Sequence, residues 1–232
     1  MPRLDIDDNV YVLNLGDDEN RFTPDWIGSV RGLLTEVAEA DESRALVTTA
    51  DGKFWSNGID LAWLAEHLDQ LDDFVEQIHG MFSQMLALPV PTIAAIQGHV
   101  FAGGAMLALA HDLRIMRADR GFFCLPEVDI RIPFTPGMGA LIQAKLTPAA
   151  ANAAMTTGAR YGGGDALRLG LVDATAEEGQ VLASALERIR PFAGKDRPTL
   201  GTIKQRMYAS AIAVLGDRAA NSSAIGFDRA NP

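Results

Sequence analysis

Hydrophobic and polar residues follow two distinct patterns along this chain. Short apolar runs bounded by turn residues predict strands over residues 10–15, 45–49, 92–96, 113–116 and 121–124. Apolar residues at helical spacing predict helices over residues 24–40, 70–87, 137–146, 148–156, 165–169, 177–190 and 198–215, and another that begins at Gly103. We therefore expect an α/β fold with a helical C-terminal region and a polar, frayed tail from Asp217.

A glycine-bracketed loop joins the strand at 92–96 to the helix that follows it. Gly98 ends the strand segment, and Gly103 and Gly104 open a helix rich in Ala, Leu and Met. The first N–H groups of a helix have no partner within the helix, and the helix dipole favours negative charge there. The glycine spacing matches neither a P-loop nor a dinucleotide fingerprint, and the chain has no G-x-S-x-G segment. The loop therefore predicts an anion pocket of another kind, or simply a close contact between strand and helix.

A second loop of the same type follows the strand at 45–49. Residues 53–61, KFWSNGIDL, carry Gly58 in a polar turn. If the two loops converge, their backbone N–H groups form an oxyanion hole, which is a pair of donors aimed at a carbonyl oxygen that gains charge.

A candidate base lies further along the chain. Glu127 follows Pro126 at the end of an apolar strand, where burial would raise its pKa and make it a better base toward a carbon acid. An ordinary surface or ion-paired glutamate is the alternative interpretation.

Composition narrows the class of protein. The 232-residue chain is 48% hydrophobic and 22% charged, which is typical of a globular protein with one sizeable core. Its net charge of −10 disfavours nucleic acid as a partner, so a phosphate-bearing ligand must meet local positive charge. No apolar run is long enough for a membrane span, and MPRLDIDDNV lacks the features of a signal peptide, so we expect a cytoplasmic protein. One cysteine and four scattered histidines predict neither a disulfide framework nor a metal site.

Four segments together resemble the signature blocks of the enoyl-CoA hydratase/isomerase, or crotonase, superfamily. They are KFWSNGIDL (53–61), PTIAAIQGHVFAGGAMLALAHD (91–112), RGFFCLPEVDI (120–130) and TGARYGGGDALRLGLVD (157–173), in the family's order and spacing. The resemblance implies a crotonase-like spiral of ββα units over residues 1–180 and a helical C-terminal trimerisation region over residues 181–232. It also implies a homotrimer or dimer of trimers that acts on an acyl-CoA thioester, with no cofactor beyond the coenzyme A of that substrate.

Matched by position, the resemblance assigns the oxyanion donors to the backbone N–H groups of Ile59 and Gly103. The family's hydratases use two glutamates, one on the central helix and one after the next strands. Here Met106 stands at the helix position, and only the second glutamate is retained, as Glu127. Hydration calls for a group that activates water and, in the family picture, a second that shares the proton transfers, whereas moving a double bond needs one base. We therefore predict an isomerase that shifts a 3-enoyl-CoA double bond to the 2-position through a dienolate, with Glu127 as the single acid/base.

Two alternatives stay open from the sequence. One is an enoyl-CoA hydratase or another crotonase-type reaction, in which Asp129 or His99 assists Glu127. The other is a catalytically silent acyl-CoA-binding protein, for which a lost glutamate would be the expected sequence mark.

Residues in and around the two loops are the candidates for substrate contact. They are Lys53, Phe54, Ser56, Asn57, Gly58, Asp60, Leu61, Phe101, Gly104, Met106 and Phe134. Core packing is the alternative for the apolar members, and shaping of the turn is the alternative for Ser56 and Asn57. Lys53 and a basic segment over residues 188–206 are the candidates for contact with the coenzyme A phosphates, in the second case across a subunit boundary.

Overall fold

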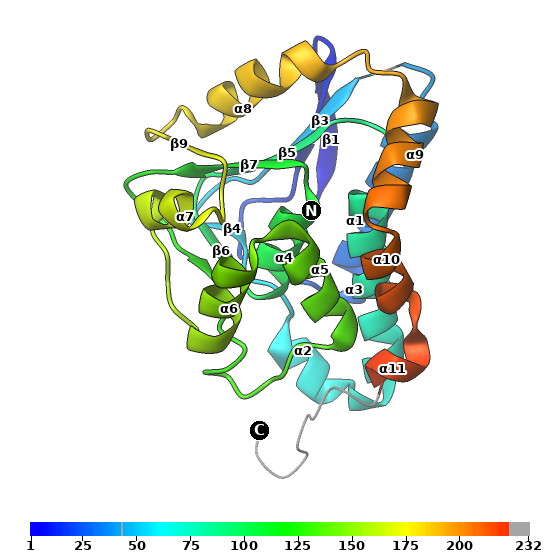
Figure 1. Ribbon diagram of the computed structural model, residues 1–232, viewed down its shortest axis with the longest axis vertical. Coiled ribbons are helices and arrows are strands. Elements are labelled where there is room, and N and C mark those ends of the chain that lie inside the picture. The colour runs from blue at the N-terminus through cyan, green and yellow to red at the C-terminus, as the bar shows by residue number, and fades with distance from the viewer. Residues whose placement is uncertain (43, 223–232) are drawn as a thin grey trace.

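The computed structural model describes residues 1–42 and 44–222, which form two β-sheets and the helices that cover them (Figure 1). The larger sheet has the strand order β1 (Arg3–Asp7), β2 (Val10–Asn14), β3 (Ala45–Thr49), β5 (Thr92–Ile96), β7 (Leu113–Arg117) and β9 (Ala174–Ala176). Only the β1–β2 pair in it is antiparallel. The smaller sheet contains β4 (Phe54–Ser56), β6 (His99–Phe101) and β8 (Phe123–Cys124), all parallel.

The helices follow the strands in a repeating order. They are α1 (Pro24–Glu39), α2 (Leu61–Glu66), α3 (Leu71–Leu86), α4 (Gly103–Ala110), α5 (Pro136–Lys145), α6 (Pro148–Thr157), α7 (Gly163–Leu169), α8 (Val181–Ile189), α9 (Arg197–Met207), α10 (Ala209–Gly216) and α11 (Arg218–Ser222), with short 3₁₀ turns at Leu68–Gln70 and Arg190–Phe192. Pairs such as β5 and β6, or β7 and β8, place one strand in each sheet before the next helix. The predicted spiral of ββα units is confirmed.

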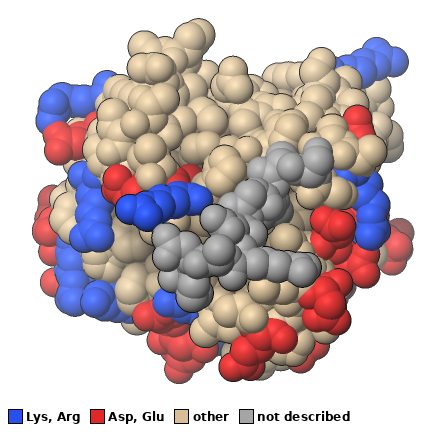
Figure 2. All heavy atoms as spheres, turned by 90° about the horizontal axis from the view of Figure 1, so that it is seen from below, with Lys and Arg blue, Asp and Glu red and all other residues tan. Residues whose placement is uncertain are grey.

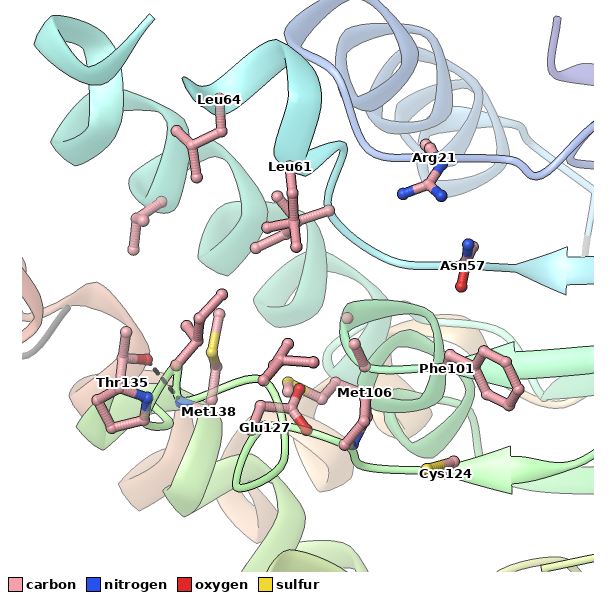
Figure 3. Close-up of a pocket in the computed structure, with 18 of the residues that line it drawn as sticks. Arg21, Asn57, Leu61, Leu64, Phe101, Met106, Cys124, Glu127, Thr135 and Met138 are labelled. Atoms are coloured by element: carbon pink, nitrogen blue, oxygen red, sulfur yellow. Dashed lines mark hydrogen bonds between the residues drawn. The ribbon is translucent and has the colours of Figure 1, made fainter. Parts of the chain in front are cut away.

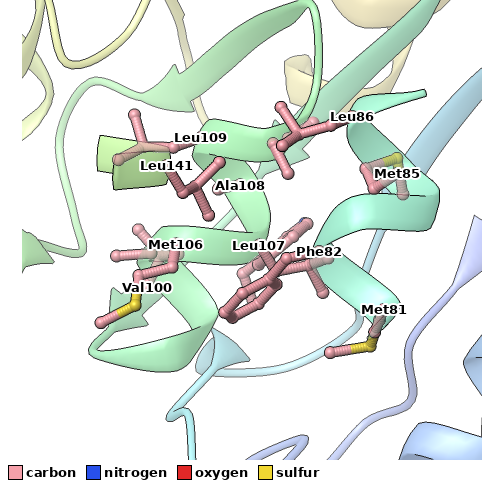
Figure 4. Close-up of a cluster of buried hydrophobic side chains, with 14 of the residues drawn as sticks. Met81, Phe82, Met85, Leu86, Val100, Met106, Leu107, Ala108, Leu109 and Leu141 are labelled. Atoms are coloured by element: carbon pink, nitrogen blue, oxygen red, sulfur yellow. The ribbon is translucent and has the colours of Figure 1, made fainter. Parts of the chain in front are cut away.

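Helices cover both faces of the larger sheet. On one face, α8 packs against alternate residues of β2, β3, β5 and β7, which explains why these strands are almost uninterrupted apolar runs. On the other face lies the main core, where every residue of α4 is buried. Met106 to Leu109 of α4 lie beside Phe82, Met85 and Leu86 of α3 (Figure 4). The central helix is thus fixed on all sides, and its first residues are held in place by the core.

Several elements differ from the sequence prediction. β4, β6, β9 and α2 are three to six residues long and lie in segments for which no strand or helix was predicted. β1 was not predicted, because its residues are mostly exposed and carry no apolar run; it joins the sheet as an edge strand paired with β2. The single helix expected over residues 198–215 is two helices, because the backbone leaves helical geometry at Tyr208. The tail expected to be frayed from Asp217 instead contains α11, whose Asn221 is buried. The remainder of that tail, residues 223–232, lies outside the described residues.

The C-terminal helices pack on the rest of the chain. α10 lies against α3 and α5, and α11 contacts the same two helices. Whether residues 181–232 form a region separate from residues 1–180 stays a prediction. In the described part of the chain, no helix has the length and apolar character needed to cross a bilayer.

The surface carries charges of both signs. Seen from below, acidic and basic side chains lie around the border of the molecule (Figure 2).

Much of the basic segment at 188–206 is bound within the chain. Lys204 is 2% exposed and binds Asp112 and the Val90 carbonyl. Arg197 donates to backbone carbonyl groups at the end of α1. The expectation that these two residues meet coenzyme A phosphates is therefore wrong, because their donors already have internal acceptors.

Candidate active site

The turn after β4 is shaped by side chains that bind its backbone. The Ser56 hydroxyl donates to the Asn20 carbonyl (2.8 Å) and accepts from the Gly58 N–H (3.2 Å). The backbone of Phe22 binds on both sides of Ile59. The Phe22 N–H donates to the Gly58 carbonyl (2.7 Å), and the Phe22 carbonyl accepts from the Asp60 N–H (3.1 Å). These bonds leave the Ile59 N–H without an acceptor among the described residues.

The turn after β6 presents a second donor. The Ala102 N–H donates to the Cys124 carbonyl (3.0 Å), and Ala102 has φ 50° and ψ −124°, a conformation that L-residues adopt at a cost of about 1–3 kcal/mol. Gly103 follows as the first residue of α4, so its N–H has no acceptor within the helix. The strained residue thus directs the start of a buried helix toward the Ile59 turn.

The two turns meet at their glycines. Gly58 has φ +72°, and a Cβ added to it would lie 2.8 Å from the Gly103 nitrogen and 3.0 Å from the Phe101 carbonyl oxygen. A Cβ on Gly104 would lie 2.6 Å from the Ser56 carbonyl oxygen. Only glycine permits this approach, so the predicted convergence of the two loops is observed. Ile59 and Gly103 line the same pocket.

Glu127 lies in the same pocket and is nearly free of solvent. Glu127 is 6% exposed, and its Oε2 has no hydrogen-bond partner among the described residues. Burial, the principal cause, raises the pKa of Glu127 from 4.5 to about 7. The loop behind it is closed by the Ile132 N–H, which donates to the Glu127 carbonyl (3.0 Å). A carboxylate with this pKa is suited to take and return a proton near neutral pH.

The pocket has a volume of about 390 Å³ and changes in polarity along its length. Its lining consists of Arg21, Asn57, Ile59, Leu61, Leu64, Leu71, Phe74, Val75, Phe101, Ala102, Gly103, Met106, Cys124, Pro126, Glu127, Ile130, Ile132, Pro133, Thr135, Met138 and Arg160. In Figure 3, Arg21, Asn57 and Phe101 lie at one end, while Leu64, Thr135 and Met138 lie toward the other, and Leu61 lies across from Glu127. Glu127 and Met106 lie between them.

Glu19 organises the polar end of the pocket. Its carboxylate accepts from the Asn57 side chain (3.1 Å) and from the Arg21 guanidinium (2.5 Å), and these two hydrogen bonds lower the pKa of Glu19. Arg160 reaches the same pocket from the loop after α6 and lies 5.8 Å from the centre of the Phe101 ring. Two cations therefore border a pocket in a chain of net charge −10.

Seven of the predicted substrate-contact residues do not line the pocket: Lys53, Phe54, Ser56, Gly58, Asp60, Gly104 and Phe134. Ser56, Gly58 and Gly104 shape the two turns, and Asp60 caps α2 by accepting from the Ala62 and Trp63 N–H groups. Phe134 packs against the core, and Lys53 lies over the Phe54 ring outside the pocket. Six of these residues lie in the two loops, and contact between the substrate and any of the seven stays a prediction.

Neither assistant proposed for Glu127 lines the pocket. Asp129 is exposed, and its carboxylate lies against Gly158, where an added Cβ would be 2.3 Å from Oδ2. His99 lies among Phe54, Phe101 and Phe122, with its Nδ1 buried and without a partner in the described chain. Glu127 is the only carboxylate among the described lining residues.

Several pocket residues were missed by sequence reasoning, notably Arg21, Leu64, Thr135, Met138 and Arg160. Leu64 lies one helical turn from Leu61, and that spacing was an available signal. Arg21, Met138 and Arg160 come from segments far apart in the sequence, and only the folded chain unites them. The described residues contain no cluster of three or more His, Cys, Asp or Glu side chains that could hold a metal ion.

Comparisons with known proteins place this architecture in a family. The family model described as enoyl-CoA hydratase/isomerase matches residues 5–222. Enoyl-CoA delta isomerase 2, peroxisomal, of Arabidopsis thaliana is 38% identical over 222 residues, covering 90% of this chain and 92% of that protein. Enoyl-CoA delta isomerase 3 of the same plant is 40% identical over 177 residues, covering 73% of this chain and 74% of that protein. The chain belongs to the enoyl-CoA hydratase/isomerase family.

Solved structures agree on the fold. Human mitochondrial delta3-delta2-enoyl-CoA isomerase superposes with a TM-score of 0.88 at 20% identity, covering 96% of this chain and 89% of that one. An enoyl-CoA hydratase from Bacillus anthracis superposes with a TM-score of 0.78 at 22% identity, covering 92% of this chain and 90% of that one. A protein named as an isomerase and one named as a hydratase share this fold. The choice between isomerisation and hydration therefore depends on the side chains of the pocket.

Proposed function

We propose that this protein converts 3-enoyl-CoA thioesters into 2-enoyl-CoA thioesters, with Glu127 as its only acid/base. The observation that carries the proposal is the single carboxylate of the described pocket, buried and with its pKa raised to about 7, in the cavity that Ile59 and Gly103 also line. Glu127 takes a proton from C2 of the bound thioester and returns it at C4. The two N–H groups hold the oxygen of the dienolate formed between these steps.

Met106 supports isomerisation over hydration. It lies on α4 at the position where the resemblance places the first hydratase glutamate, it lines the pocket, and it is 1% exposed. A thioether cannot transfer a proton, and one general acid or base contributes about 10²- to 10⁴-fold to a rate. With Asp129 exposed and His99 outside the lining, no second acid/base faces the pocket among the described residues. The relatives named enoyl-CoA delta isomerase, at 38% and 40% identity, favour the same reaction.

The polarity of the pocket orients the substrate. We assign the coenzyme A side to the end bordered by Arg21, Asn57 and Arg160, because these donors suit phosphate and amide groups. The acyl chain then extends toward the leucines of α2 and the residues of α3 and α5. Lys53, which is exposed and lies over the Phe54 ring, stays a candidate for contact with the phosphates.

A substrate panel separates the three candidate functions. The wild-type protein is given a 3-enoyl-CoA, and the appearance of the conjugated 2-enoyl thioester is followed by its ultraviolet absorbance. It is then given a 2-enoyl-CoA, and loss of that absorbance reports hydration. The proposal expects rapid conversion of the first substrate and little hydration of the second. Faster hydration would favour a hydratase, and tight binding without turnover of either substrate would favour a silent binding protein.

We also propose that the protein assembles as a homotrimer or a dimer of trimers. Phe192, Ile203 and Met207 are 44%, 52% and 60% exposed and line an apolar groove beside α9. Light scattering after size-exclusion chromatography gives the mass in solution, and a monomer would contradict this proposal.

The cytoplasmic location also stays a proposal, to be tested by cell fractionation. The relative enoyl-CoA delta isomerase 2 is named peroxisomal.

A further inference from the structure

Val75 of α3 lies between two cavities. It is 4% exposed and lines the main pocket together with Leu71 and Phe74 of the same helix. It also lines a second cavity of about 20 Å³, whose other walls come from α3 itself and from residues 215–222 of α10 and α11. We propose that Val75 is the partition that ends the acyl pocket and thereby sets the longest acyl chain that the protein accepts. This inference rests on the proposed function.

The partition is held firmly from the α5 side. His79, one turn along α3 from Val75, is 2% exposed, and burial lowers its pKa to about 4. The ring is therefore neutral, and its partners assign the tautomer: Nδ1–H donates to the Leu215 carbonyl (3.2 Å), and Nε2 accepts from the Thr135 hydroxyl (2.9 Å). Thr135 lines the main pocket and caps α5 by accepting from the Met138 N–H (3.1 Å). One imidazole thus ties α3 to the opposite wall of the pocket.

α11 closes the small cavity behind Val75. The Asn221 side chain accepts from the Gly137 N–H of α5 (2.9 Å) and donates to the carbonyl groups of Val214 and Asp217 (2.8 Å each). Arg218 of the same helix pairs with Asp73 and Glu76 of α3. α11 therefore bridges α3 and α5, and Figure 1 shows it beside both helices, away from β4 and β6. An acyl chain that reaches Val75 meets a wall supported from behind.

The size of the Val75 side chain then decides which substrates fit. Fitting or excluding one methylene in an apolar pocket changes kcat/KM by about 10- to 200-fold. Replacing Val75 by alanine removes two methyl groups from the partition and joins the two cavities. Replacing it by leucine adds a methylene to the partition, and we expect this to shorten the pocket. The two changes must therefore move the preference for acyl length in opposite directions.

The experiment measures kcat/KM for a series of even-numbered 3-enoyl-CoA substrates with wild type, Val75→Ala and Val75→Leu. We expect Val75→Ala to move the optimum to a longer chain by at least one two-carbon step, and to raise the ratio of long- to short-chain kcat/KM by about 10-fold. Val75→Leu should lower that ratio by a similar factor.

A matched control variant and a binding measurement separate the effect of Val75 on acyl length from effects on stability or turnover. Val30→Ala makes the same substitution at a buried position of α1 that does not line either cavity, so its length profile should equal that of wild type. Calorimetry then measures the affinities for saturated acyl-CoAs of the same lengths. These affinities report how Val75 limits acyl length, and they do not depend on turnover. Identical length profiles for wild type and both Val75 variants, in binding and in turnover, would overturn the inference. A length shift in binding without isomerisation would instead overturn only the proposed function.

Discussion

At the scale of single residues, the site depends on one carboxylate placed where its charge is poorly solvated. Glu127 is buried in a lining that otherwise holds mostly apolar side chains, and its Oε2 has no partner in the described chain. A buried carboxylate without a partner destabilises the folded state when it ionises, and the same property makes it a competent base near neutral pH. Under the proposed function, stability and catalysis are thus opposed at this position.

The first prediction concerns the stability of Glu127→Gln. The folded pKa of about 7 lies above the reference value of 4.5, so Glu127 binds more protons in the folded state between these values, and the contribution of Glu127 to stability falls as pH rises through this window. Above it, the ionised side chain destabilises the folded state by about 3.5 kcal/mol at most, because the pKa rises from 4.5 to about 7 and each pKa unit corresponds to about 1.4 kcal/mol. Urea denaturation should show Glu127→Gln more stable than wild type at about pH 8 and nearly equal at about pH 4.5. A less stable variant at the higher pH would contradict the assigned burial.

At the scale of elements, two turns and one loop build the site, and helices fix them. α4 is buried at every residue, so the Gly103 N–H is held by the core, whereas the Ile59 N–H is held by Phe22 on a separate segment. The periodicity of α1 and α3 made these helices predictable from the sequence, and the glycine-bracketed turns were predictable from Gly58, Gly103 and Gly104. β1 was missed because it is a mostly exposed edge strand, and α11 because it has a polar composition. β4, β6, β9 and α2 were also missed, because segments of three to six residues carry too little pattern.

The second prediction concerns α11 as a support for α5. Asn221 is 2% exposed and accepts from the Gly137 N–H, so Asn221→Ala leaves a buried donor without a partner. An unsatisfied buried group of this kind destabilises by about 1–3 kcal/mol, which equilibrium denaturation resolves. Ser222→Ala is the matched control, since it removes only a bond to the Arg218 carbonyl within the same helix. Equal stability of the two variants would show that α11 does not anchor α5.

At the scale of the whole molecule, the topology gathers residues that no local pattern connects. The pocket draws on the turn before α1, on α2 and α3, on the loop after β8, and on α5 and Arg160. Family blocks in the sequence identified the turns and Glu127, because those positions are set by backbone geometry and by a short motif. Arg21, Thr135 and Met138 could not be assigned, because their place in the pocket depends on how helices and turns from distant segments pack.

The third prediction concerns the acid stability of the whole fold. Burial lowers the pKa of His79 to about 4 and that of His111 to about 3, so both rings stay neutral in the folded state while they protonate in the unfolded chain near 6.5. As pH falls from 6.5 to 5, the excess of protons that these two rings bind in the unfolded state rises from about one to about two, and Glu127 offsets about one of them. Stability should fall toward pH 5, with a slope that approaches about 1.4 kcal/mol per pH unit at the lower end of this window. Denaturant titrations at several pH values test this, and constant or rising stability toward pH 5 would contradict it.

The central claim is that one buried carboxylate moves the proton between C2 and C4. The most direct measurement is kcat for isomerisation of a 3-enoyl-CoA by Glu127→Gln, beside Met106→Leu as the control and with coenzyme A ester affinity measured for each. The account predicts a loss of at least about 10³-fold for Glu127→Gln with affinity retained, and activity within about threefold of wild type for Met106→Leu. Isomerisation by Glu127→Gln at the wild-type rate would contradict the account.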